Sequence, residues 1–287
     1  MRDLFQKTNW DGINQPNQIL ERFPTLAIGF TTRNGGESCA PFDSLNVGLH
    51  VSDDKESVIK NRLRVSEMLG FPLSNWVTIE QVHHNHIEKF DKNFLHINRD
   101  IHQPLFPSCD GVYTDQKNIL LVTFYADCTP LYFFAPKYGF IGLAHSGWKG
   151  TATEIGKKMI QIWVEKENIP RSDIHVVIGP SIGACCYEVD DHIRLPILKT
   201  IDSALNDQVF VSKGNGKYGM DLKRINYFQM IACGILENQI YCTNHCTSCL
   251  NEVYFSYRRD QGKTGRMMSF IGLKEDYRGS FTTACTN

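Results

Sequence analysis

The sequence contains no long hydrophobic run and no marked excess of either charge, and these absences exclude several classes of protein. No apolar stretch approaches the roughly 18–20 residues that a membrane-spanning helix needs. The first residues, Met1–Lys7, lack the apolar core of a signal peptide. The 30 Lys and Arg residues balance 31 Asp and Glu residues, which leaves no general attraction to nucleic acid or to anionic membrane. We therefore expect a cytoplasmic protein without nucleic acid or a membrane as partner.

Paired histidines and paired cysteine motifs are also scarce, and this limits the metal chemistry that the chain can support. Ten histidines include a single His-x-His, His84-Asn85-His86, whereas a multicopper oxidase needs many such pairs. A zinc base deaminase would need His-x-Glu followed by Pro-Cys-x-x-Cys, but the only Cys-x-x-Cys, Cys246 to Cys249, follows a histidine. Because no export signal is present, we expect the ten cysteines to be reduced.

What the chain does contain is a set of soft-metal ligands, each placed directly after a predicted buried strand. The apolar run that starts at Phe140 ends in His145, and Cys128 follows a run from Ile119 to Phe124. A third run, Trp76 to Ile79, precedes a histidine cluster. Two histidines and one thiolate around one ion fit zinc best and leave a fourth position open, although Cu²⁺ accepts the same ligands. Spacing alone does not choose among His83, His84 and His86.

Two features beside these ligands bear on the chemistry. Asp127 precedes Cys128, where a carboxylate can orient a ligand, carry a proton or cap a turn. The turn from Gly147 to Thr151 follows His145 and offers backbone N–H groups and a helix N-terminus to an anion. A nucleophilic pair of Cys128 and His145 is an alternative, and it predicts a hydrolase that forms a thioester.

Capping signals predict three helices, and apolar runs such as Ile174 to Gly179 predict the strands. Asp53-Asp54 starts a helix that Gly70 ends. The segment Thr151-Ala152-Thr153-Glu154 forms a capping box for a second helix, which stops before a proline. A third helix begins near Asp221. The chain has no internal repeat, low-complexity tract or linker, so we expect one domain across residues 1–287.

Three glycine- or cysteine-rich stretches are better explained by structure than by ligand binding. Gly214 to Gly219 matches a dinucleotide-binding glycine pattern but lacks the surrounding strand–helix–strand unit, so we expect a turn. Cys185 and Cys186 are adjacent, which makes them poor partners for one metal. Cys242, His245, Cys246 and Cys249 form one cluster of soft donors, but zinc sites of this kind usually pair two such knuckles. We therefore expect Cys185 and Cys186 to be structural or pocket-lining, and the cysteines of the 242–249 cluster to be loop and core residues.

Several motifs together resemble a known family across nearly the whole chain. The strongest are Gln81-Val82-His83, Ala126-Asp127-Cys128-Thr129-Pro130-Leu131, His145-Ser146-Gly147-Trp148-Lys149-Gly150-Thr151, and the stretch from Gly179 to Glu188. Supporting matches are Thr32-Arg33 with Gly35-Gly36, Asn46 with Gly48, Asn61-Arg62, and Ser256-Tyr257-Arg258-Arg259. In this combination the chain resembles the purine nucleoside phosphorylases long described as laccase-domain polyphenol oxidases, some of which are described as peptidoglycan editing factors.

The resemblance implies a fold, a metal site and a reaction. The fold is α/β (α+β), with mixed sheets in four layers, α/β/β/α. The metal site is zinc held by His83, Cys128 and His145, which selects His83 from its cluster, and the implied catalytic residues are Asp127, Cys128 and His145. The implied reaction is phosphorolysis of adenosine, inosine, guanosine and S-methyl-5'-thioadenosine to base and ribose 1-phosphate, with adenosine deaminase activity. Purine nucleosides and phosphate are the expected partners, and the protein is expected to be a monomer or homodimer.

Candidate substrate-binding residues follow from the same motifs, with phosphate at the Gly147–Thr151 turn and its neighbouring cations. They are Arg33, Asn46, Lys149, Arg258 and Arg259. The chain departs from the family pattern at His84, where glycine is usual, and at Lys149, where arginine is usual and would offer a bidentate fork. The alternatives are a copper-dependent polyphenol oxidase, a Cys/His hydrolase acting in peptidoglycan editing, and a non-catalytic zinc protein.

Overall fold

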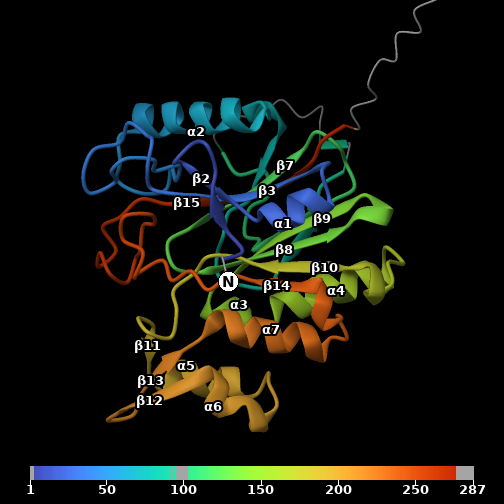
Figure 1. Cartoon of the computed structure of the whole chain (residues 1–287), viewed down its shortest axis with the longest axis vertical. Helices are drawn as coiled ribbons and strands as arrows, with labels where there is room; N and C mark the ends of the chain where they lie inside the picture. Colours follow the sequence, from blue (N-terminus) through green and yellow to red (C-terminus); the bar gives the residue numbers. More distant parts are fainter. Residues whose placement is uncertain (1–2, 92, 95–102, 276–287) are drawn as a thin grey trace, which may run out of the picture.

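Two large sheets form the centre of the molecule (Figure 1). The computed structural model describes residues 3–91, 93–94 and 103–275. Within these residues, the first sheet has six strands in the order β1 (Gln6–Lys7), β2 (Ile13–Gln15), β3 (Leu26–Thr31), β15 (Met267–Leu273), β7 (Leu120–Tyr125) and β4 (Trp76–Thr78). The second sheet, also of six described strands, has the order β14 (Ile240–Cys242), β10 (His175–Ile178), β8 (Thr129–Ala135), β9 (Phe140–Ser146), β6 (Gly111–Thr114) and β5 (Ile87–Lys89).

Both sheets are mixed. The pairs β4–β7, β5–β6 and β10–β14 are parallel, whereas neighbours such as β8–β9 and β3–β15 are antiparallel. The central strands β7, β8 and β15 are buried along their whole length, because each contacts the other sheet on one face and helices on the opposite face. Strands buried on both faces explain the continuous apolar runs of the sequence.

Helices cover the outer face of each sheet (Figure 1). Helix α2 (Lys55–Leu69) packs on the first sheet, where Val65 joins a core with residues of β7 and β15. Helices α4 (Ile155–Glu165) and α7 (Leu222–Ala232) pack on the second sheet through side chains such as Met159 and Met230. The largest core lies between the two sheets. The predicted α/β/β/α arrangement with mixed sheets is therefore confirmed.

The remaining elements lie around these four layers. A third sheet of three described strands, β11 (Glu188–Val189), β13 (Lys217–Met220) and β12 (Phe210–Gly214), projects beyond α7 together with two short helices (Figure 1). The short helices are α1 (Asn17–Arg22), α3 (Trp148–Ala152), α5 (Asp191–Leu198) and α6 (Asn206–Val209). Turns of 3-10 helix occur at Leu73–Asn75, Pro136–Tyr138, Arg171–Asp173, Ser203–Leu205 and Glu237–Gln239.

Most of the local signals are confirmed, and one is wrong. Asp54 caps α2 by accepting a hydrogen bond from the Ser57 N–H, and Gly70 ends this helix in the left-handed conformation at φ 69°. Asp221 caps α7 in the same way as Asp54. The capping box at Thr151 is wrong, because the chain already becomes helical at Trp148, directly after Gly147. Thr151 lies inside α3, and α4 starts only after Glu154 has adopted a left-handed conformation.

Two further predictions concern the chain as a whole and its glycine-rich stretch. Asn215 and Gly216 both have positive φ and form the tight turn between β12 and β13, so the turn predicted there is confirmed. No helix in the described part of the chain is long and apolar enough to cross a membrane. One domain across residues 1–287 stays a prediction.

Candidate metal and substrate site

The three predicted ligands come from two passages of the chain between sheets and from one strand. His83 lies in the connection from β4 in the first sheet to β5 in the second. Cys128 lies in the short connection from β7 in the first sheet to β8 in the second. His145 is the sixth residue of β9, which is the neighbour of β8. The ligands therefore meet at the end of the seam between the two sheets.

The side chains of His83, Cys128 and His145 converge closely enough to hold one ion. One ligand atom from each residue lies within 4.8 Å of the others, and the two imidazole rings meet edge to face with their centroids 4.7 Å apart. Cys128 is half-buried, His145 is buried and His83 is exposed. Gly147 leaves room beside them, because a Cβ at this position would lie 3.0 Å from Cys128 Sγ and 3.3 Å from His83 Cδ2. The donors and the space fit a metal ion.

A buried carboxylate, Asp110, holds both histidines of this group in place. Its Oδ1 lies 2.8 Å from His145 Nδ1, and its two oxygens accept hydrogen bonds from the backbone N–H groups of Val82, His83 and His84 at 2.7–3.2 Å. Nδ1–H of His145 donates to this carboxylate, so Nε2 presents its lone pair as a ligand. Asp110 is absent from the candidate residues of the sequence, because no local pattern connects it to partners 26 to 35 residues away.

Charges in this group favour the thiolate form of Cys128. Burial raises the pKa of the Cys128 thiol, but the neighbouring His145 and His83 outweigh burial and lower this pKa. Burial lowers the pKa of His145, whereas Cys128 and Asp110 raise it by a larger amount. Burial raises the pKa of Asp110, but the hydrogen bonds from His145 and the backbone lower it below its usual range. A thiolate is the form in which cysteine binds a metal or acts as a nucleophile.

Asp127 occupies a strained position beside Cys128. Its φ is 90°, and His83 also has a positive φ of 61°, a conformation that costs a non-glycine residue roughly 1–3 kcal/mol. The Asp127 carboxylate accepts hydrogen bonds from Thr247 Oγ1 and from the backbone N–H of Arg258, both at 2.7 Å. Both oxygens are therefore engaged by the C-terminal part of the chain, which favours a positioning role.

A cavity of about 1160 Å³ opens over the three ligands. Its lining includes Asp127 and aromatic side chains on several sides: Phe124, Tyr125, Trp148, Tyr187 and Tyr257. Gln81 shapes one wall, because its side-chain amide accepts from the backbone N–H of Phe124 at 2.7 Å and donates to the Phe124 carbonyl at 2.9 Å. An aromatic-lined cavity with a few polar groups is typical of a small-molecule site.

Of the five candidate substrate-binding residues, Arg258 lines this cavity, with its guanidinium 4.9 Å from the ring centroid of Tyr187. The guanidinium of Arg33 pairs with Asp43 at 3.1 Å, and that of Arg259 pairs with Asp260 and donates to backbone carbonyls. The amino group of Lys149 lies over the Trp148 ring. Arg33, Asn46, Lys149 and Arg259 are outside the residues that line the cavity. Their part in substrate binding stays a prediction.

Asn46 instead binds the backbone of Arg266, a cavity residue that was not among the candidates from the sequence. Its buried side chain accepts from the Arg266 backbone N–H at 2.8 Å and donates to Asp53 Oδ2 at 2.8 Å. Arg266 lines the cavity together with Arg62 and His50. Burial lowers the pKa of Arg62 to about 10 and, with Arg266 and Arg62 nearby, lowers that of His50 to about 4. We call Arg62, Arg258 and Arg266 the basic wall, because these three residues bring guanidinium groups to the lining of the cavity.

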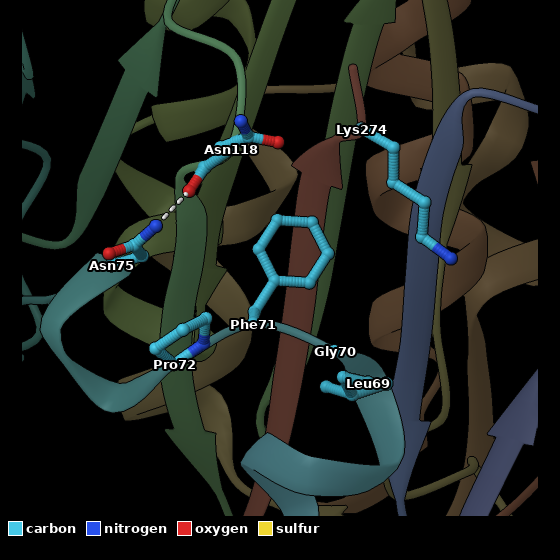
Figure 2. Close-up of a pocket in the computed structure, with 7 residues that line it drawn as sticks. All are labelled: Leu69, Gly70, Phe71, Pro72, Asn75, Asn118 and Lys274. Atoms are coloured by element: carbon cyan, nitrogen blue, oxygen red, sulfur yellow. Dashed lines mark hydrogen bonds between the residues drawn. The ribbon is translucent and has the colours of Figure 1, made fainter. Parts of the chain in front are cut away.

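A smaller hollow of about 460 Å³ lies at the C-terminal end of α2, where Phe71, Pro72 and Lys274 line it (Figure 2). The side chain of Asn75 in this hollow donates to the backbone carbonyl of Asn118 at 2.9 Å. Of the seven described residues that line the hollow, Lys274 is the one that carries a charge. The hollow offers no group for chemistry among these residues, so the large cavity is the candidate site.

Comparison with known proteins gives the chain a family. Residues 27–274 match the family described as multi-copper polyphenol oxidoreductase laccase. The chain is 43% identical to purine nucleoside phosphorylase YlmD of Geobacillus stearothermophilus over 96% of this chain and 100% of that protein. It is 40% identical to purine nucleoside phosphorylase YlmD of Bacillus subtilis over 93% of each. The crystal structure of the Geobacillus YlmD superposes with a TM-score of 0.89 over 96% of this chain and 100% of that chain. The chain therefore belongs to the family described as multi-copper polyphenol oxidoreductase laccase.

Proposed function

We propose that this protein is a cytoplasmic, zinc-dependent purine nucleoside phosphorylase that also deaminates adenosine. The observation that carries the proposal is the His83, Cys128 and His145 cluster on the surface of the large cavity, in a chain whose relatives are named purine nucleoside phosphorylases. The proposed substrates are phosphate and adenosine, inosine, guanosine or S-methyl-5'-thioadenosine. The products are the free base and ribose 1-phosphate.

His83, Cys128 and His145 would hold the zinc ion, with a fourth position open to water or substrate. When bound there, zinc supplies Lewis acidity and lowers the pKa of a coordinated water towards roughly 7. Asp110 fixes the donor nitrogen of His145 and the loop that carries His83. Asp127 fixes the connection that carries Cys128, because its carboxylate joins that connection to Thr247 and Arg258. These contacts support a preorganised ligand set.

The lining of the cavity supports the binding of a purine and of an anion, because it contains both aromatic rings and guanidinium groups. Trp148 offers an aromatic ring against which a planar base can pack, whereas the rings of Tyr187 and Tyr257 carry the guanidiniums of Arg258 and Arg266 at 4.9 and 5.8 Å from their centroids. The basic wall offers guanidinium groups, which bind phosphate bidentately. His50 beside this wall carries a pKa near 4 and stays neutral at pH 7, so the positive charge there comes from the arginines. We therefore propose that phosphate binds at the basic wall and that the base packs against Trp148.

Copper-dependent phenol oxidation has less support from this arrangement. Among the described residues, a single cluster of this kind contains histidine, and it holds two histidines and one cysteine. A multicopper oxidase needs several histidine-rich centres to pass electrons to oxygen. The Cys/His hydrolase and the non-catalytic zinc protein predict other results in the assay below. The hydrolase works without metal, and the non-catalytic protein gives no turnover.

The test is a product analysis with matched variants. The purified protein is analysed for zinc and incubated with adenosine, with and without phosphate, and the products are separated by chromatography. We expect adenine and ribose 1-phosphate only when phosphate is present. Inosine should form even when phosphate is absent, because deamination does not use it. His83→Ala should abolish both activities and lower the zinc content. His84→Ala is the matched control, because its exposed side chain is outside the cluster.

Three outcomes would contradict the proposal. Bound zinc without either product would favour the non-catalytic reading. Turnover that persists after zinc is removed would favour a metal-independent Cys128–His145 pair. Loss of activity in His84→Ala with full activity in His83→Ala would show that His84, and not His83, is the zinc ligand.

A further inference from the structure

Four cysteines outside the cavity converge in a second cluster. Cys185 and Cys186 come from the loop after β10, and Cys246 and Cys249 come from the segment after β14. One ligand atom from each of the four lies within 4.8 Å of the others. Cys249 Sγ is 3.5 Å from Cys185 Sγ and 3.4 Å from Cys186 Sγ. The two cysteine pairs that the sequence separates by about 60 residues are therefore neighbours in the fold.

The fold brings these segments together because β10 and β14 are adjacent parallel strands. Beyond the strands, the pairing continues as a bridge between Ser181 and Cys246, with the Thr247 N–H donating to the Ser181 carbonyl at 3.1 Å. A tight turn follows, in which the N–H groups of Cys186 and Tyr187 both donate to the Gly183 carbonyl. In this turn both adjacent cysteines reach Cys249, so adjacency does not prevent them from sharing one ligand.

The spacing of the sulfur atoms is that of a mononuclear metal site. Tetrahedral zinc with Zn–S bonds of about 2.3 Å separates its sulfur atoms by about 3.8 Å. A disulfide would bring two sulfur atoms to about 2.05 Å. An iron–sulfur cluster would hold them further apart, because several iron and sulfide atoms lie between the cysteines. The distances of 3.4 and 3.5 Å and the upper bound of 4.8 Å are close to the tetrahedral value.

Groups around the cluster suit the negative charge of four thiolates on a divalent ion. The Gly183 N–H donates to Cys246 Sγ at 3.2 Å, a contact that stabilises a thiolate. The ammonium group of Lys223 donates to the carbonyls of Ser181 and His245 on the strand extensions that lead to the cluster. Lys213 donates to the Cys185 carbonyl at 3.5 Å. The Gly183 N–H is thus a direct donor to one sulfur atom of the cluster, and the two lysines bind the backbone of the segments that carry the cysteines.

We propose that Cys185, Cys186, Cys246 and Cys249 bind one structural zinc ion. Four protein thiolates fill every tetrahedral position, so this site has no place for water or substrate, in contrast to the three-ligand cluster in the cavity. The thiols release their protons when the ion binds, and no electron is transferred. The proposal does not depend on the function assigned to the cavity, because the two ligand sets share no residue.

The site would join the two segments that hold the cavity wall. Thr247, directly after Cys246, donates to Asp127 through its hydroxyl group, and its carbonyl accepts from Arg259. Tyr187, directly after Cys186, lines the cavity. An ion at the cluster would therefore fix Tyr187 and the Thr247 partner of Asp127 without touching substrate.

The test measures zinc per chain by elemental analysis in a set of variants. We expect two equivalents in the native protein and one in Cys249→Ser or Cys186→Ser. Cys128→Ala should also hold one equivalent, and its remaining zinc should show four sulfur neighbours at about 2.3 Å by X-ray absorption. Cys39→Ser and Cys242→Ser are the controls, because these exposed cysteines are outside both clusters and should leave the zinc content unchanged.

The results separate failure here from failure in the cavity. One outcome is a native protein with one zinc that is lost in Cys249→Ser and retained in Cys128→Ala. That result supports the four-cysteine zinc site and contradicts the proposed zinc site in the cavity. If Cys249→Ser and Cys186→Ser keep the native zinc content, the four-cysteine proposal is overturned. A disulfide among these cysteines, detected by mass spectrometry of protein purified without reductant, would also overturn it. If Cys249→Ser and Cys186→Ser fail to fold, the X-ray absorption spectrum of Cys128→Ala decides, because four sulfur neighbours around its zinc support the proposal and fewer contradict it.

Discussion

His145 Nδ1 lies 2.8 Å from Asp110 Oδ1, and the same carboxylate binds the backbone of the loop that carries His83. One buried side chain thus sets the direction of one ligand and the position of another. This relationship makes Asp110 the first target for mutation.

Asp110→Asn should weaken zinc binding by about 10- to 100-fold, as is usual when the hydrogen-bond partner of a metal-bound histidine is removed. The neutral amide no longer favours the tautomer with Nε2 free, and it offers one acceptor oxygen in place of two. Competition with a chelator of known affinity measures the effect. Asp115→Asn is the control, because Asp115 is exposed just beyond β6. Unchanged zinc affinity in Asp110→Asn would remove Asp110 from the site.

Gly147→Ala should exclude the metal by filling the space beside the ligands. The backbone at Gly147 has φ −70°, which any residue adopts, so the effect comes from space and not from backbone strain. The added methyl would lie 3.0 Å from Cys128 Sγ and 3.3 Å from His83 Cδ2. We expect loss of zinc and of activity, measured by elemental analysis and product formation, in a protein whose circular dichroism is native. Full zinc content with native activity would show that the methyl is accommodated.

Arg266→Ala should raise the phosphate KM by about 10- to 100-fold, since a hydrogen bond to a charged group contributes roughly 1.5–3 kcal/mol. Arg266 lines the cavity, and its guanidinium donates to the carbonyls of Thr264 and Gly265, which hold it in place. Steady-state kinetics with phosphate varied at saturating nucleoside measures the change. Arg171→Ala is the matched control, because Arg171 is exposed and outside the cavity lining. An equal rise of phosphate KM in both variants would argue against the basic wall as the phosphate site.

His175 should make the protein less stable in acid. Burial and, to a smaller extent, the nearby Arg22 lower its pKa from 6.5 to about 4, although Asp173 acts in the opposite direction. The ring stacks on Phe134 and Tyr241, and its Nδ1 has no hydrogen-bond partner within the described structure. Because the folded pKa is the lower one, the neutral ring contributes stability above pH 6.5 that is lost as the pH falls towards 4.

The variant His175→Phe keeps the stacking and removes the titration. Between pH 7 and pH 5 the native protein should lose about 1 kcal/mol more unfolding free energy than this variant, allowing for solvent screening. Urea unfolding at the two pH values measures the difference. His192→Phe is the control, because His192 is exposed on α5 and should leave the pH dependence unchanged. Equal pH dependence in the native protein and His175→Phe would contradict the prediction.

The elements that the sequence predicted well are those set by neighbouring residues. Apolar runs identified β7 and β10 because both faces of these strands are buried, and Asp54 with Gly70 identified the ends of α2 because caps act within one turn. The capping box at Thr151 failed because tertiary contacts prevail there. The Thr151 hydroxyl bonds Ser146 and the side chain of Asn226 inside the fold, so it is not free to cap a helix.

The parts of the candidate sites that the sequence did not reveal depend on contacts between distant segments. Asp110 meets its partners only when β6 pairs with β9. Arg266 enters the cavity because β15 crosses the first sheet between β3 and β7. Cys185 and Cys246 each belong to a motif that is incomplete by itself, and the strand pair β10–β14 combines the two. The spacing of residues along the chain does not predict which of these distant segments pair.

The two passages between the sheets, after β4 and after β7, have a consequence for how the protein assembles. Both carry a proposed zinc ligand, so the proposed ligands converge only when the two sheets have docked in their final register. A chain with one sheet formed would present isolated donors of low affinity. Binding of the proposed metal should therefore be among the last events of folding. Once bound, the ion should link the two sheets and slow their separation during unfolding. Apoprotein should exchange its amide hydrogens fastest at this end of β4, β7 and β9.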